Sequence, residues 1–351
     1  MLLNLAAGRR VLFAGGKGGV GKTSVASAVA YAQARAGRRV LLVSTDPAHN
    51  LGHLWERTVG DRRTPLAEVG AGRLEGLEID PVRTTEEHLA AVRATMRRYM
   101  PEHLAGEVDR HIELARDAPG THEAAILDRL AETIESALAT DDLVVVDTAP
   151  SGHTARLMRL PETMSAWTEG LLRRQHRSGR FGRALRRLAP DDAAADLVGS
   201  GERKVAEEGS RGSRDEELRR LLTRRRDRLA GLRDLLADAG RTAFVIVLVA
   251  ERVPVLETLE LHADLTRSGL AVSALVVNRR SPDAGPFLAA RRRGETGQID
   301  HLRRHLPAVP VVELPLLEGD VLGVGGVARL ADAMGAAADP GSDRTADRLD
   351  P

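Results

Sequence analysis

Residues 16–23, GKGGVGKT, restrict the fold of this chain more than any other stretch. They fit the pattern G-x-x-x-x-G-K-[ST], in which glycines let the backbone wrap around a phosphate group with its N–H groups pointing inward. The pattern requires a strand before it and a helix after it. The apolar run Val11–Ala14 and the helical stretch Lys22–Ala36 meet both requirements. We therefore expect a β-strand, a phosphate-binding loop and an α-helix, in this order, near the N-terminus.

Further short apolar runs predict the rest of a sheet. Most are apolar throughout, which is typical of strands in a parallel sheet that helices cover on both faces. Helical stretches such as Ala124–Ala139 and Val255–Ser268 lie between them. We expect an α/β fold with a doubly wound, mostly parallel sheet of about seven or eight strands, of the P-loop NTPase type. The runs with strand character are Val11–Ala14, Val40–Ser44, Leu74–Ile79, Leu143–Val146, Phe244–Val249, Val272–Val277 and Val309–Leu314.

Two helical intervals interrupt this alternation, at about residues 84–118 and 158–238. We interpret them as segments of an inserted α-helical subdomain within one P-loop domain over residues 1–335. Within the second interval, residues 170–235 are dominated by Arg, Asp and Glu. Residues 336–351 are polar and have little to bury, which predicts a flexible tail.

Composition excludes several classes of protein. The net charge of +1 argues against a dedicated nucleic-acid binder, which is usually strongly basic. The chain has no cysteine, so disulfides, thiolate metal sites and iron–sulfur clusters are excluded. No apolar run reaches the roughly 18 residues that a membrane-spanning helix needs. We expect a cytoplasmic protein with no integral membrane segment.

The residues that follow the loop glycines and end two strands indicate nucleotide chemistry. Lys22 is expected to reach the β- and γ-phosphates of a nucleotide, and Thr23 to offer a hydroxyl to Mg²⁺. Asp147 follows the apolar strand 143–146, as an acid that holds Mg²⁺ through water commonly does. Asp46 follows the strand 40–44, and the carboxyl ends of such strands are where α/β sheets bind ligands. We therefore expect a nucleoside triphosphate and Mg²⁺ as cofactors, and the resemblance described below implies that the nucleotide is ATP.

Lys17 needs a separate explanation. The chain has 51 Lys and Arg residues, of which only Lys17, Lys22 and Lys204 are lysines. A lysine is a compact charge on a flexible stem, whereas the arginine fork is wider and planar. The segment KGGVGKT resembles the deviant Walker A group of P-loop ATPases. The resemblance implies that Lys17 reaches across a dimer interface to the partner's nucleotide.

Three motifs together resemble one family, the arsenite-pump and tail-anchored-protein-targeting ATPases. KGGVGKTS, STDPAHNL and DTAPSGHTARLM are similar to that family's P-loop, switch I and switch II. The resemblance runs in collinear order over nearly the whole chain, and it implies a bacterial-type, cysteine-free member. Other matching segments are LEIDP (Leu77–Pro81), PGTHEA (Pro119–Ala124), VLVAERVPVLET, VVN and LPLLEGDVLG (Leu314–Gly323).

The resemblance also implies residue roles. Asp46, Lys17 and Lys22 would be catalytic, with Asp46 positioning or activating the attacking water. Thr23 and Asp147 would lie on the Mg²⁺ side, and Asn278 would read the adenine. Taken from the residues alone, Glu251 and Asn278 would more often cap or turn the strands that they end. The residues expected to bind nucleotide are Gly16, Lys17, Gly18, Gly19, Val20, Gly21, Lys22, Thr23, Ser24, Glu251, Asn278, Pro315 and Leu316.

The missing cysteines limit the implied partners. Soft As(III) prefers thiolate ligands, so metalloid-stimulated activity is not expected. The region after Asn278 lacks a Cys-x-x-Cys pair for zinc, so a homodimer, or a heterodimer with a related ATPase, would be held by packing and nucleotide. Flexible methionines suit apolar protein clients, and Met96, Met100, Met158 and Met164 lie in or beside the helical intervals. These helix faces could instead pack on one another, which leaves a membrane-helix client open.

Two other functions stay open at this level. A partitioning or positioning ATPase would act on DNA or a membrane surface. The polar residues 340–351 disfavour a membrane-binding helix, and the arginine runs at 173–187 and 219–228 have acidic neighbours. The chain could also bind ATP as the partner of a paralogous chain without hydrolysing it, although intact Lys22 and Asp46 argue against this.

Overall fold

A central eight-stranded sheet organises the protein. The computed structural model describes residues 1–46, 50–99, 105–116, 118, 120–148, 220 and 223–336. All neighbouring strands pair in parallel except β3, which is antiparallel to β4. In spatial order the strands are β3 (Thr64–Val69), β4 (Gly72–Glu78), β2 (Arg39–Ser44), β5 (Leu143–Asp147), β1 (Val11–Gly15), β6 (Thr242–Val249), β7 (Val272–Arg280) and β8 (Val311–Pro315). The expected mostly parallel α/β fold is confirmed, and β3 is the strand that the apolar runs did not predict.

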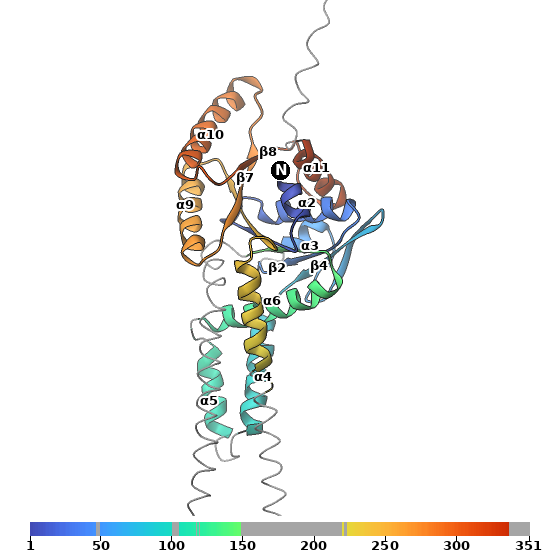
Figure 1. Ribbon diagram of the computed structural model, residues 1–351, viewed down its shortest axis with the longest axis vertical. Helices are drawn as coiled ribbons and strands as arrows, with labels where there is room; N and C mark the ends of the chain where they lie inside the picture. Colours follow the sequence, from blue (N-terminus) through green and yellow to red (C-terminus); the bar gives the residue numbers. More distant parts are fainter. Residues whose placement is uncertain are drawn as a thin grey trace, which may run out of the picture.

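Helices cover both faces of the sheet (Figure 1). Alternate side chains of β1 enter two different apolar clusters, Leu12 and Ala14 on one face and Val11 and Phe13 on the other. The first face is covered by α1 (Leu2–Ala7), α2 (Lys22–Arg35), α3 (Asn50–Trp55) and α11 (Gly323–Ala336). The second is covered by α6 (Thr121–Thr140), α9 (Arg252–Arg267), α10 (Gly285–His305) and the helix formed by residues 223–237. This arrangement is a doubly wound sheet.

Helix α2 is the most deeply buried of these elements, since 11 of its 14 residues are buried. Its sequence, KTSVASAVAYAQAR, is rich in alanine, which lets the backbone of the helix lie close to the sheet. At Gly72 in β4, an added Cβ would come within 2.0 Å of the Ala34 carbonyl oxygen. This close contact places the C-terminal turn of α2 directly against β4.

Helices α4 (Pro81–Tyr99) and α5 (Ala105–Arg116) project from the sheet along the long axis of the molecule, beside residues 223–237 (Figure 1). Leu89, Val108 and Ile112 form a small apolar cluster between α4 and α5, and Met96 packs against it. Met100, Met158 and Met164 lie outside the described residues, as do most of the interval 158–238 and the tail beyond 336. The predicted boundaries of the helical subdomain stay a prediction.

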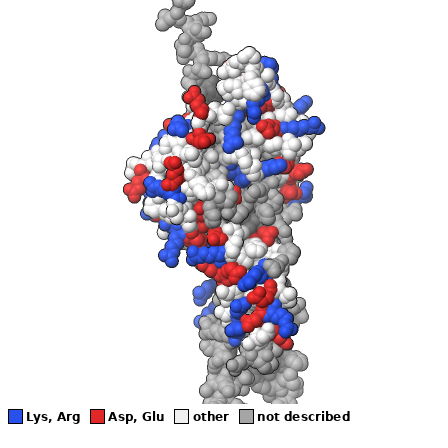
Figure 2. All heavy atoms as spheres, turned by 180° about the vertical axis from the view of Figure 1, so that it is seen from behind, with Lys and Arg blue, Asp and Glu red and all other residues white. Residues whose placement is uncertain are grey.

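The surface of the projecting helices is charged with both signs. Figure 2 shows basic and acidic side chains intermixed on the face that it draws. Arg97 pairs with Asp109, and Arg116 with Glu86, so α4 and α5 are joined by ion pairs. Within the described part of the chain, every helix is too short or too polar to cross a bilayer.

Candidate functional site

The phosphate-binding loop connects the end of β1 to the start of α2, and two glycines explain its path. At Gly16, with φ +143°, an added Cβ would lie 2.2 Å from the Val247 carbonyl oxygen. At Gly21, with φ +92°, it would lie 2.3 Å from Nδ2 of Asn278. The loop therefore lies directly against the ends of β6 and β7, which only glycine permits at these two positions.

The start of α2 meets the end of β5 below the loop. The Thr23 hydroxyl donates a hydrogen bond of 2.7 Å to Oδ2 of Asp147. Nζ of Lys22 donates a 2.9 Å hydrogen bond to the carbonyl oxygen of Lys17, and its side chain is only 5% exposed. Ser24, in the first turn of the same helix, is half-buried. The sheet register brings these residues together, because Asp147 lies beside Ala14 in β1 and Ser44 in β2.

Electrostatics at this point indicate a cation site. Burial raises the pKa of Asp147 to about 7; the Thr23 hydroxyl and Lys22 oppose the rise, while Asp46 and Glu78 add to it. Oδ1 of Asp147 is buried and has no hydrogen-bond partner among the described residues. A buried carboxylate oxygen is costly unless it is paired, and Mg²⁺ takes hard oxygen ligands of this kind. The residues Thr23 and Asp147 therefore fit a Mg²⁺ site.

Lys22 shares this environment. Burial lowers the pKa of Lys22, whereas the carboxylates of Asp147 and Asp46 partly offset that effect. Asp46 follows β2, and its backbone N–H donates to the Ser44 hydroxyl oxygen at 3.3 Å. Its Oδ2 accepts a 3.1 Å hydrogen bond from Nδ2 of Asn50 at the start of α3. Lys22, Asp46 and Asp147 thus lie at one edge of the sheet, although residues 47–49 and 149–154 of the two switches lie outside the described residues.

Glu78 is a site residue to which the sequence assigned no role. It ends β4 and is 2% exposed. Its Oε1 accepts hydrogen bonds from the backbone N–H groups of Leu51 at 2.9 Å and Gly52 at 3.4 Å. It therefore anchors the first turn of α3, which carries the partner of Asp46. An acidic residue ending a buried strand, within LEIDP, was the signal that could have identified it.

The end of β7 contacts the loop from the other side. Nδ2 of Asn278 donates a 2.9 Å hydrogen bond to the Val20 carbonyl oxygen, and the side chain is 6% exposed. Arg279, with φ +57°, donates from Nη1 to the Gly19 carbonyl oxygen at 3.2 Å. The backbone N–H of Leu316, which follows Pro315, donates to the Arg280 carbonyl oxygen at 2.8 Å. Asn278 therefore contacts the loop, and residues 315–316 lie next to the strand that carries it.

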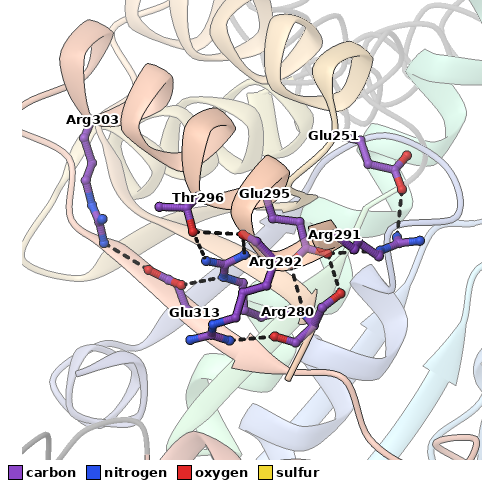
Figure 3. A network of polar contacts seen from close by, with 9 residues as sticks. Glu251, Arg280, Arg291, Arg292, Glu295, Thr296, Arg303 and Glu313 are labelled. Atoms are coloured by element: carbon purple, nitrogen blue, oxygen red, sulfur yellow. Dashed lines mark hydrogen bonds and ion pairs between the residues drawn. The ribbon is translucent and has the colours of Figure 1, made fainter. Parts of the chain in front are cut away.

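An ionic network with Arg280 and Glu295 buried at its centre connects the elements on this side of the loop (Figure 3). Arg280, 7% exposed, donates to Glu295 of α10 at 2.7 Å and to Glu313 of β8 at 2.9 Å. Arg291 then joins Glu295 to Glu251, with both distances 3.1 Å. Glu251 immediately precedes α9, is exposed, and forms an ion pair with Arg291 of α10. The network joins β7 to both β8 and α10 beside the loop.

Lys17 differs from the rest of the loop because its side chain is 45% exposed. Its Nζ forms an ion pair with Glu257 of α9. Gly18 and Gly19 are exposed as well, whereas Val20 is buried. The loop therefore presents one accessible cation on its outer side and one buried cation, Lys22, on its inner side.

Comparison with known proteins agrees with this geometry. Residues 9–336 match the anion-transporting ATPase family. The chain belongs to that family. It is therefore an ATPase that hydrolyses ATP, and the expected resemblance is confirmed.

Relatives of several kinds align with most of the chain. ATPase ASNA1 homolog 1 of Paramecium tetraurelia is 26% identical, with 92% of this chain and 91% of that protein covered. ATPase GET3B of Arabidopsis thaliana is 28% identical over 92% of this chain and 78% of its own length. The arsenical pump-driving ATPase of Escherichia coli is 29% identical over 89% of this chain, which spans only 47% of that longer protein.

Proposed function

We propose that this anion-transporting-family ATPase works as a Mg²⁺-dependent dimer, in which ATP draws two phosphate-binding loops together. The carrying observation is the accessible Lys17 beside a site where Thr23 and Asp147 converge on one point. A buried set of groups can hold one triphosphate, and an exposed cation on the outer side of the same loop can reach a second. A second copy of this chain is the simplest source of that triphosphate.

The chemical roles follow from the surroundings of each group. Asp46 is half-buried and near Lys22, which suits it to orient the attacking water at the γ-phosphate. Lys22 and the N-terminus of α2 would stabilise the charge that develops on the phosphate oxygens. When bound at Thr23 and Asp147, Mg²⁺ would supply further neutralisation of the β- and γ-oxygens. Glu78 would hold α3, and thereby Asn50, in place to orient Asp46.

We assign client binding to the helical region formed by α4, α5 and residues 223–237. These helices project from the sheet, and only Ile79 and Asp80 separate Glu78, the last residue of β4, from the start of α4. Movement of switch I on hydrolysis would therefore be transmitted to the base of the projection. The chain has no cysteine to bind a soft metalloid, so we assign it no metalloid. The protein client is assigned on the likeness to the ASNA1 and GET3B ATPases.

The Asp46→Asn variant tests this function. An amide cannot accept the proton of the attacking water, so phosphate release should fall about 100-fold or more, while ATP binding persists. The matched control is Asp300→Asn, which changes an exposed acid on α10 and should hydrolyse ATP at the unmodified rate.

The same variant should trap the ATP-bound state for crosslinking in a lysate of the source cell. Recovery of the chain with itself and with a protein client supports the proposal. Recovery of a paralogous ATPase alone would replace the homodimer by a heterodimer, and full hydrolysis by Asp46→Asn would contradict the assigned role of Asp46.

A further inference from the structure

The ion pair between Lys17 and Glu257 lies within one chain. Glu257 is in the second turn of α9, and its Oε1 binds Nζ of Lys17. Oε2 is buried and lacks a hydrogen-bond partner among the described residues. Gly16, Val20 and Pro254 line the same recess between the loop and α9. The carboxylate therefore faces the outer side of the phosphate-binding loop.

The backbone and the side chain of Lys17 are held by different elements. Lys22 donates to the Lys17 carbonyl oxygen, so the backbone is fixed within its own loop. Only the side chain of Lys17 contacts α9, through Glu257. The two side chains are partly exposed, Lys17 by 45% and Glu257 by 30%. The neighbouring Val253 and Leu256 on α9 are also exposed, at 56% and 46%. The lysine side chain can therefore leave Glu257 without rearrangement of the loop.

We infer that Glu257 is a positioning residue that holds Lys17 within its own chain and must release it for Lys17 to bind the partner's triphosphate. The inference rests on the proposed function. A single lysine cannot be drawn fully toward both anions, so the carboxylate and the phosphates compete for it. Glu257 also places a negative charge close to the approaching triphosphate, which repels it. Both effects oppose closure until ATP is present in sufficient concentration.

The strength of the pair suits such a competition. A partly exposed ion pair is weak compared with the charge-assisted bonds that a lysine makes with a triphosphate. Glu257 would therefore set the threshold for dimer closure without preventing it. Loss of the carboxylate should lower the ATP concentration for half-maximal self-association by about threefold or more.

The test titrates ATP against self-association by light scattering, with the full-length chain carrying Asp46→Asn to stop hydrolysis. In this background Glu257→Gln and Glu257→Ala should both lower the midpoint. The control Glu260→Gln, an exposed acid further along α9, should leave it unchanged. In combination with Lys17→Ala, the Glu257→Gln change should not restore self-association, because the lysine that it controls is gone. A merely structural role of Glu257 would leave the midpoint unchanged or raise it.

The outcomes separate the inference from the proposed function. An unchanged or raised midpoint in both Glu257 variants, with Lys17→Ala still abolishing self-association, overturns the inference and leaves the proposed function standing. Restoration of self-association by Glu257→Gln in the protein that lacks Lys17 overturns it too. If Lys17→Ala leaves self-association intact, the proposed function fails and the inference fails with it. Retention of the unmodified melting temperature shows that each variant is folded.

Discussion

Two carboxylates at the carboxyl ends of the strands, Asp46 and Asp147, have different surroundings. Asp46 follows β2 and Asp147 ends β5. Asp147 is wholly buried beneath Thr23, whereas Asp46 is only half-buried and bound to Asn50. A buried acid with an unpaired oxygen suits a cation, and a more accessible acid suits a water molecule. Two carboxylates at neighbouring strand ends thus have different chemistry because of their surroundings.

Glu78 gives a prediction at the scale of one residue. Glu78→Ala removes the acceptor for the Leu51 and Gly52 N–H groups, which should destabilise the fold by about 1–2 kcal/mol and lower ATP hydrolysis through Asp46. Glu78→Gln keeps an acceptor oxygen of the same size and should retain most of both. Urea unfolding and phosphate release measure the two effects. Equal losses in the two variants would show that the charge matters and the hydrogen bonds do not.

The sequence predicted those site residues whose role is local. The loop glycines, Lys22 and Thr23 form a contiguous pattern, and Asp46 and Asp147 end recognisable strands. Glu78 and Glu257 were not predicted, because their partners lie 27 and 240 residues away along the chain. Whether a strand-ending acid anchors a helix or faces solvent depends on packing that one sequence does not reveal.

Among the larger elements, the strands that are buried on both faces were all visible as apolar runs. β3 was not, because in TPLAEV only Leu66 is buried while Pro65 and Glu68 are exposed. An antiparallel edge strand covered on one face lacks the continuous apolar run of a central strand. The first helical interval corresponds to α4 and α5, whose amphipathic sequences place Leu89, Val108 and Ile112 in a shared cluster.

The junction of α4, α6 and residues 223–237 predicts a dependence of stability on pH. His88 lies 3.5 Å from Asp128, which also binds Arg225 at 2.5 Å. Burial lowers the pKa of His88, Arg225 lowers it further, and Asp128 opposes the change. Since the ordinary pKa is 6.5, the unfolded chain takes up a proton below that pH that the folded chain resists. The stability of the fold should therefore fall as the pH drops through 6.5.

His88→Gln should lose less stability than the unmodified chain between about pH 7.5 and about pH 5.5, because it removes the group that takes up the proton. Urea unfolding at the two pH values gives the difference. His305→Gln, at an exposed position on α10, is the control and should retain the full dependence. A loss in His88→Gln as large as that of the unmodified chain would contradict this account of the junction.

At the scale of the whole molecule, β4 and α3 connect the candidate site to the projecting helices. Glu78 anchors α3 on one side, and α4 begins at Pro81 on the other. The ionic network of Arg280, Glu295 and Glu313 lies on the opposite flank of the loop and joins β7, β8 and α10. Closure of a dimer would bring the same edge of two sheets together, with Lys17 of each facing the other's triphosphate.

The most direct test of this account is sedimentation velocity of Asp46→Asn and of Asp46→Asn combined with Lys17→Ala, each with and without Mg²⁺ and ATP. The account predicts that ATP converts the first protein from monomer to dimer and leaves the second monomeric, although both bind ATP. A full ATP-dependent dimer in the protein that lacks Lys17 would contradict the claim that this lysine joins the two nucleotide sites.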